Sequence, residues 1–126
     1  MQNVTHLIDN KHDTVVSVAP GAMVLEAIRL MAEHGIGSVL VMRDGMLVGI
    51  VSERDYARNV ALRGRASATT AVSEIMSEPV TVGPNETINN CMQLMTARRI
   101  RHIPVLDGER LLGQVSIGVL VKAGTE

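Results

Sequence analysis

The sequence GIVSERDYAR at residues 49–58 ends a run of alternating apolar residues and opens a segment with a helical pattern. Its Gly-x-Val-Ser pattern returns sixty-four residues later in GQVSIGVLVK at 113–122. The carboxylate of Asp55 does not return, because Val119 occupies the matching position. The chain therefore repeats a strand-to-helix turn and lacks a carboxylate in its second copy.

The repeat covers nearly the whole chain. Ten of the 35 positions in 18–52 are identical to their partners in 82–116. This self-similarity indicates duplication of one unit and not a solenoid, which needs about three or more units. We place the two repeats at 4–64 and 72–123, joined by a small and polar linker at 65–71.

Each repeat contains the same order of predicted elements. A short β-rich run, at 14–18 or 79–82, precedes a helix whose apolar residues fall at i, i+3, i+4 and i+7. Two apolar runs follow, and Asp-Gly between them, at 44–45 and 107–108, predicts a hairpin. A second helix begins after the Gly-x-Val-Ser sequence. The order β-α-β-β-α occurs twice and predicts an α+β fold, in which helices pack on a sheet.

Composition and charge argue against several classes of protein. The net charge of −1 and the absence of Phe and Trp argue against nucleic-acid binding, because neither a basic excess nor aromatic platforms are present. No apolar run approaches the roughly 18 residues that span a bilayer. The start MQNVTHLIDN lacks the features of a signal peptide, and the single cysteine, Cys91, cannot form an intramolecular disulfide. We therefore expect a cytoplasmic protein with no membrane or nucleic-acid partner.

Catalytic and metal-binding patterns are also missing from the sequence. The four histidines and Cys91 do not have the spacing of a zinc site, and Cys91 falls on an apolar helix stripe. No Ser-His-Asp or Cys-His set can be assigned, and no Gly-rich phosphate loop is present. We expect neither an enzyme nor a metal protein.

The tandem pattern, the G-x-V-S-x-x-D turn and the sequence RIRHIPV at 99–105 resemble the CBS-domain family, named for cystathionine β-synthase. The resemblance covers essentially the whole chain. It implies two CBS repeats packed as a pseudo-twofold pair with two clefts, in which many members bind AMP, ADP, ATP, S-adenosylmethionine or NAD. It also implies a regulatory role without catalysis, and a flat homodimer.

Ser52 and Asp55 allow two interpretations. The first is a capping box, in which the Ser hydroxyl accepts from the amide of residue 55 and the carboxylate accepts from the amide of residue 52. In the second repeat Ser116 starts the matching helix with Val119 at the third position, so a helix is expected there without the box. The second interpretation follows the resemblance, in which an Asp at this place binds both ribose hydroxyls and the Ser and helix amides meet phosphate. One residue can have both roles.

The sequence RRIRH at 98–102 is the one dense basic cluster. Arg98 and Arg99 end the first helix of the second repeat, where cations complement the helix dipole. Arg101 and His102 begin a strand, and the resemblance implies that they contact phosphate groups, for which the planar guanidinium is suited. Their equivalents in the first repeat, at 37–38, are small and uncharged.

The family geometry pairs the halves crosswise and implies two unequal nucleotide sites. Site one consists of Ser52, Arg54, Asp55, Pro79, Val80, Ile100, Arg101 and His102. Site two consists of Thr14, Val15, Ile36, Gly37, Ser38 and Ser116. Site two has no ribose carboxylate, so the chain is expected to hold one full nucleotide site. The alternative is that site two binds the ribose through another group or binds a different ligand.

Three functions follow from these observations, in order of preference. The first is a stand-alone sensor that binds an adenine nucleotide, AMP, ADP, ATP or NAD, between its repeats and signals to a partner in trans. The second is a dimerisation scaffold without a ligand, which has no need for Asp55 or Arg101 beside a cleft. The third, nucleic-acid binding through residues 98–102, is opposed by the net charge and the missing aromatic residues.

Overall fold

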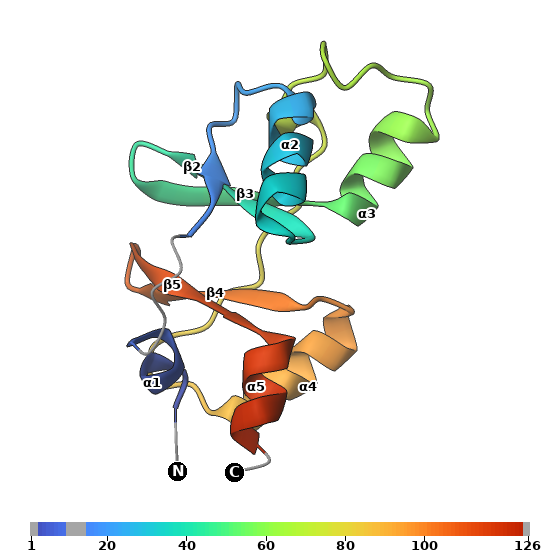
Figure 1. The fold of residues 1–126 in the computed structure, drawn as a ribbon. Coiled ribbons are helices and arrows are strands. Elements are labelled where there is room, and N and C mark those ends of the chain that lie inside the picture. Colours follow the sequence, from blue (N-terminus) through green and yellow to red (C-terminus); the bar gives the residue numbers. More distant parts are fainter. Residues whose placement is uncertain (1–2, 10–14, 125–126) are drawn as a thin grey trace. The chain divides into compact units, whose positions relative to one another are not determined.

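The computed structural model describes residues 3–9 and 15–124. The chain divides into two compact units, each built on one of the sequence repeats (Figure 1). The first-repeat unit is Val16–Pro79, and the second-repeat unit combines Val80–Glu126 with Met1–Val15. Helices and strands occur in both units, so the predicted α+β class is confirmed.

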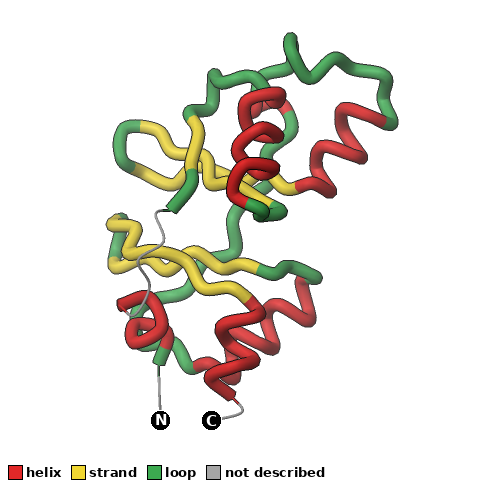
Figure 2. Tube along the Cα trace, in the orientation of Figure 1, coloured by secondary structure: helices red, strands yellow, loops and turns green. Residues whose placement is uncertain are grey.

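The first-repeat unit is a three-stranded sheet with helices packed on it (Figures 1 and 2). β1 is parallel to β2, and β2 is antiparallel to β3. The elements are β1 (Ser17–Val18), α2 (Val24–His34), β2 (Ser38–Arg43), β3 (Met46–Ser52), α3 (Glu53–Tyr56), a π-helix (Ala57–Ala61) and a 3₁₀-helix (Val72–Glu74).

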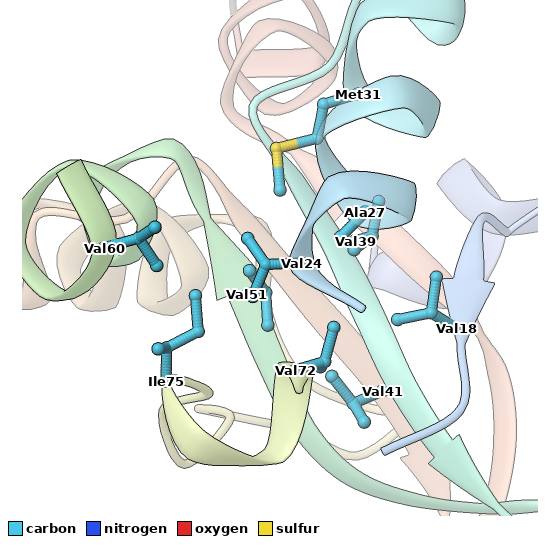
Figure 3. Packing of buried hydrophobic residues seen from close by; sticks show 10 residues of the cluster. All are labelled: Val18, Val24, Ala27, Met31, Val39, Val41, Val51, Val60, Val72 and Ile75. Carbon is cyan, nitrogen blue, oxygen red and sulfur yellow. The ribbon is translucent and has the colours of Figure 1, made fainter. Parts of the chain in front are cut away.

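The core of this unit lies between α2 and the sheet. Val24, Ala27 and Met31 form the buried stripe of α2, at the spacing that the sequence predicts. Figure 3 shows these side chains turned toward the strands. The other buried members of the cluster are Val18, Val39, Val41, Val51, Val60, Val72 and Ile75. Burial of a valine side chain contributes about 1.5 kcal/mol or more, so this cluster is a main source of the unit's stability.

The second-repeat unit repeats the hairpin and its two covering helices. Val82 forms a parallel bridge with Val105, which is the counterpart of the β1–β2 pairing. The elements are α1 (Val4–Asp9), α4 (Ile88–Arg98), β4 (His102–Asp107), β5 (Arg110–Ser116) and α5 (Ile117–Gly124). The buried core contains Val4, Val82, Cys91, Met95, Ile103, Val105, Val115 and Leu120.

Each unit includes the segment with which the other predicted repeat begins. Val4 of α1 is buried in the core of the second-repeat unit, and Val72 is buried in the core of the first-repeat unit. The glycine of each Gly-x-Val-Ser sequence accommodates this packing. A Cβ at Gly49 would lie 2.6 Å from the sulfur of Met76, and one at Gly113 would lie 2.8 Å from Cγ2 of Ile8. The repeats predicted from the sequence and the packing units therefore have different boundaries.

The two hairpins turn differently. In the first, Asp44 and Gly45 both have positive φ, 51° and 80°, as a type I′ turn requires. In the second, Asp107 pairs with Arg110, so the turn residues are 108–109 and the predicted Asp-Gly turn at 107–108 is wrong by one residue. Positive φ falls on Gly108, at 64°, because a type II′ turn needs glycine at its first central position.

The two long helices begin in different ways. The side chain of Thr87 caps α4 by accepting from the amide of Asn90. Met23, the N-cap of α2, has no such side chain, and the first two helical amides donate instead to the carbonyls of Thr70 and Ser67 over 2.8 and 3.0 Å. The 65–71 linker therefore satisfies donors that a helix start leaves without an internal partner.

Candidate functional site

Ser52 is the N-cap of α3 at the end of β3. Its hydroxyl accepts from the amide of Asp55 at 3.1 Å, and Asp55 Oδ2 accepts from the amide of Ser52 at 2.9 Å. The Ser52 hydroxyl also donates to Oδ2 over 3.0 Å. The predicted capping box is therefore present, and the carboxylate of Asp55 is held at the strand-to-helix turn in a half-buried position.

Ser77 completes this turn and was missed by the sequence analysis. Its hydroxyl donates to Asp55 Oδ1 over 2.8 Å, and its backbone exchanges two hydrogen bonds with Ile50 of β3. The two side chains are 22 positions apart in the sequence, so no local motif connects them. The exposed Ser77 hydroxyl and the Ser52 turn together hold Asp55 through both carboxylate oxygens.

The matching turn of the second repeat begins α5 without a carboxylate. The hydroxyl of Ser116 accepts from the amide of Val119 at 3.3 Å. The expectation that this helix starts without a capping box is confirmed, and α5 extends over 8 residues whereas α3 has 4 before its π-helical continuation. A helix therefore starts at this fold position with the serine cap and without an aspartate.

Both turns are joined to the neighbouring strand by the same backbone hydrogen bond. The amide of Glu53 donates to the carbonyl of Gly37 at 2.9 Å, and the amide of Ile117 donates to the carbonyl of Arg101 at 2.8 Å. The side chains at this junction differ in charge. A Cβ at Gly37 would lie 3.3 Å from Oε1 of Glu53, so the first-repeat junction carries a carboxylate, whereas the second carries the exposed guanidinium of Arg101.

The basic cluster at 98–102 is divided between a helix end and a strand start. Arg98 is the last residue of α4, as predicted, and Arg99 follows it in the left-handed conformation with φ of 56°. Arg101 is exposed, and His102 is the half-buried first residue of β4. His102 pairs with Ser116 in the hairpin register.

The predicted site residues are distributed over both units. The first-repeat unit holds Ser52, Arg54, Asp55 and Pro79 of site one, with Ile36, Gly37 and Ser38 of site two. The second-repeat unit holds Val80, Ile100, Arg101 and His102 of site one, with Val15 and Ser116 of site two. Thr14 lies outside the described residues. Within a unit the hairpin brings parts of both sites together, as in the pairing of Ser38 with Ser52; assembly across the units stays a prediction.

Cys91 has the environment of a core residue. It is fully buried on α4, and desolvation, together with the nearby charge of Glu86, raises the pKa of its thiol to about 11. Such a thiol stays protonated at neutral pH and is a poor nucleophile. Within residues 3–9 and 15–124 no three His, Cys, Asp or Glu side chains are grouped to hold a metal ion. No helix in the same ranges is long and apolar enough to cross a bilayer.

Comparison with known proteins relates this chain to a family. The family model "CBS domain" matches residues 11–62 and 72–126. A mitochondrial CBS domain-containing protein of Arabidopsis thaliana, CBSX3, is 42% identical over 106 residues, which are 79% of this chain and 52% of that protein. The CBS domain-containing protein YhcV of Bacillus subtilis is 36% identical over 113 residues, 89% of this chain and 80% of that protein. The chain thus spans about half the length of the Arabidopsis relative.

A solved structure agrees with these sequence matches. A protein with CBS domains from Burkholderia ambifaria has a TM-score of 0.91 and 46% identity to this chain, covering 98% of this chain and 93% of its own. The fold and the family are therefore shared over nearly the whole sequence.

Proposed function

The chain belongs to the CBS-domain family, and from this premise we propose that it binds an adenine nucleotide and signals its presence to a partner protein in trans. Tandem CBS domains generally act as regulatory modules that bind adenosyl ligands. The proposed ligand is AMP, ADP, ATP or NAD, and the proposed role is regulatory and not catalytic.

The observation that carries this proposal is the arrangement around Asp55. Its carboxylate is half-buried at a strand end, and its Oδ1 accepts from the exposed hydroxyl of Ser77. A ribose hydroxyl is the same kind of donor, so a nucleoside can add to or replace this hydrogen bond without leaving a buried group unpaired. Hydrogen bonds to an ionised carboxylate are the stronger class, which favours a diol ligand here.

The remaining roles follow from the side chains at the other predicted positions. We assign the phosphate to Arg101 and His102, because a guanidinium presents a planar set of donors to phosphate oxygens. We assign the base to the apolar side chains of Pro79, Val80 and Ile100, each of them half-buried and available for contact. These assignments predict that adenosine binds more weakly than AMP.

The rival function is a scaffold without a ligand. It has one observation in its favour, because three hydrogen bonds from Ser52 and Ser77 already occupy the carboxylate of Asp55 within the protein. A purely structural residue has the same appearance. The two functions differ in whether a nucleotide stabilises the folded protein.

Thermal denaturation with and without nucleotide tests the proposal. A ligand at about 100 times its dissociation constant adds about 2.7 kcal/mol to the free energy of unfolding. We expect a rise in Tm with at least one of AMP, ADP, ATP and NAD, and a smaller rise with adenosine at the same concentration. No rise with any of the four at millimolar concentration would favour the scaffold.

We also propose a homodimer in the cytoplasm. Ile117 and Val121 lie four residues apart on α5, are 38% and 45% exposed, and form an apolar stripe that isologous pairing can cover. Light scattering that gives a monomer mass at micromolar concentration, with and without nucleotide, contradicts the dimer. The compartment stays a prediction, since the Arabidopsis relative is mitochondrial.

A further inference from the structure

The helical segment that follows the Asp55 turn ends in an exposed patch that the proposed nucleotide site does not use. Its members share one property, exposure to solvent, and we name them the Arg-Leu patch: Ala57, Arg58, Ala61, Leu62 and Arg63. Leu62 is 81% exposed, about twice as much as the other exposed large apolar side chains of the described residues. A single exposed leucine is ordinary on a protein surface, so the residues around Leu62 decide whether the patch can bind a partner.

The exposure of Leu62 follows from the backbone. Residues 57–61 form a π-helix, and the amide of Leu62 donates to the carbonyl of Ala57 at 2.9 Å. The same turn buries Val60 in the core and leaves Leu62 on the outside. π-Helical turns occur often at functional sites, and the residue after this one, Leu62, stands between Arg58 and Arg63 in the sequence.

The charge of the patch contrasts with that of the chain. Residues 57–65 contain three arginines and no acidic residue, while the whole chain carries a net charge of −1. Arg65 pairs with Glu74 at 2.5 Å. Among the residues that the structure describes, neither Arg58 nor Arg63 makes an ion pair. Two guanidinium groups beside Leu62 are therefore available to a partner.

We propose that the Arg-Leu patch docks an acidic helix of a partner protein that carries leucine on the contact face. Leu62 supplies apolar contact, and Ala57 and Ala61 are small enough to let another backbone approach. Arg58 and Arg63 bind carboxylates through paired donors and attract an acidic partner during the encounter.

Two other partners fit the patch less well. A single-stranded nucleic acid is usually bound by stacking of its bases on aromatic side chains, and the chain has neither Phe nor Trp. A membrane surface needs a broad apolar face on a helix, and Leu62 is the one large apolar side chain of the patch. The proposal deepens the proposed function, because it names the surface that the partner contacts, but docking itself requires no nucleotide.

Fluorescence anisotropy with a defined probe tests the proposal. The probe is a labelled helical peptide of about 14 residues with leucines on one face and glutamates four residues apart beside them. We expect saturable binding that weakens with salt, and a loss of about tenfold or more in affinity for both Leu62→Ser and Arg58→Glu. Arg43→Glu, the same charge change at an exposed position of the first hairpin, is the matched control and keeps the affinity.

Four results would overturn the proposal. One is equal affinity of the patch variants and the Arg43→Glu control. Another is equal binding of a probe in which lysine replaces each glutamate. The third is preferential binding of single-stranded DNA or of phosphatidylserine vesicles. The last is a dimer that dissociates in Leu62→Ser while the peptide affinity stays unchanged, because the patch would then contact a second copy. Asp55→Ala separates the two proposals, since it weakens nucleotide binding by about tenfold or more and leaves peptide binding in place.

Discussion

The turns at Ser52 and Ser116 have the same backbone and different chemistry. In each, a serine at a strand end accepts from the amide three residues later. The amide directly after the serine donates to the carbonyl of the residue just before the neighbouring strand. Only the first turn has a carboxylate, on Asp55, and only it has a further hydroxyl, from Ser77, bound to that carboxylate. This difference shows which of these side chains a helix start at this turn uses in both repeats, and which are found in the first repeat alone.

The second turn shows that this helix starts with the serine cap alone. Val119 gives α5 no carboxylate, yet the helix begins at the equivalent place and buries Leu120. Asp55 is therefore more than helix initiation requires, and the ligand role that we propose would account for it. The variants below test this difference, beginning with the one expected to have the largest effect.

Asp55→Ala removes the carboxylate from the first turn. Loss of a charge-assisted partner of a ribose costs about 1.5–3 kcal/mol, which is roughly 10- to 150-fold in affinity for the nucleotide. The serine cap remains, so we expect the free energy of unfolding to fall by only about 1 kcal/mol. Calorimetry measures the first quantity and urea denaturation the second.

The control for this variant is Glu109→Ala, which removes a carboxylate from the exposed second hairpin. It should leave nucleotide affinity unchanged. If Asp55→Ala binds nucleotide as the unaltered protein does, Asp55 is a helix cap and nothing more.

Val119→Asp is the reciprocal change at the second turn. It supplies a carboxylate where Ser116 already caps the helix, and we expect a second, weaker binding event or a gain of roughly fivefold at an existing one, about 1 kcal/mol. We expect a smaller gain because Gly37 and Ser38 offer no positive charge at the positions that match Arg101 and His102, which we propose as phosphate ligands. A calorimetric isotherm identical to that of the unaltered protein contradicts this expectation.

The ends of α2 and α4 extend the comparison to stability. Both helices end in a left-handed residue, Gly35 with φ of 63° and Arg99 with φ of 56°. A residue with a Cβ pays about 1 kcal/mol in this conformation, so Arg99→Gly should raise the free energy of unfolding by up to that amount. Gly35→Ala should lower it by a similar amount, and urea denaturation of both variants checks the pair. A loss of stability in Arg99→Gly would show that the side chain contributes more than its conformation costs.

Glu74 provides the smallest expected effect. Its carboxylate accepts from the amide of Ala71 and pairs with Arg65, and these two contacts lower its pKa. A lowered pKa in the folded protein contributes stability above the unfolded value, and this contribution is lost as the pH falls through the folded value. Glu74→Gln should therefore be slightly less stable than the unaltered protein at pH 7, and this difference in the free energy of unfolding should disappear as the pH falls below the lowered pKa of Glu74. A stability difference that persists at low pH would assign the effect to packing.

The sequence predicted the features that depend on short-range patterns. The duplication, the two hairpins and the buried helix stripe of Val24, Ala27 and Met31 each show in residues that repeat or lie close together in the sequence. The structure contains each of them. The capping box at Ser52 was predictable as well, because its two members are three residues apart.

Contacts that depend on tertiary packing were not predictable in this way. The hydroxyl of Ser77 reaches Asp55 only because the segment after the 3₁₀-helix pairs with β3. Val4 is buried in the second-repeat unit, where its amide donates to the carbonyl of Glu86, far along the chain. The turn at 108–109 differs from the prediction because the strand register, and not the Asp-Gly sequence, decides which two residues are central.

The stoichiometry of nucleotide binding tests the central claim most directly. AMP titrated into the unaltered protein in a calorimeter, with protein concentration fixed by amino-acid analysis, counts the sites per chain and measures their affinities. The asymmetry of the two turns predicts about one high-affinity site per chain, weakened about tenfold or more in Asp55→Ala. Two sites of equal affinity, or one site whose affinity is unchanged in Asp55→Ala, would contradict the account.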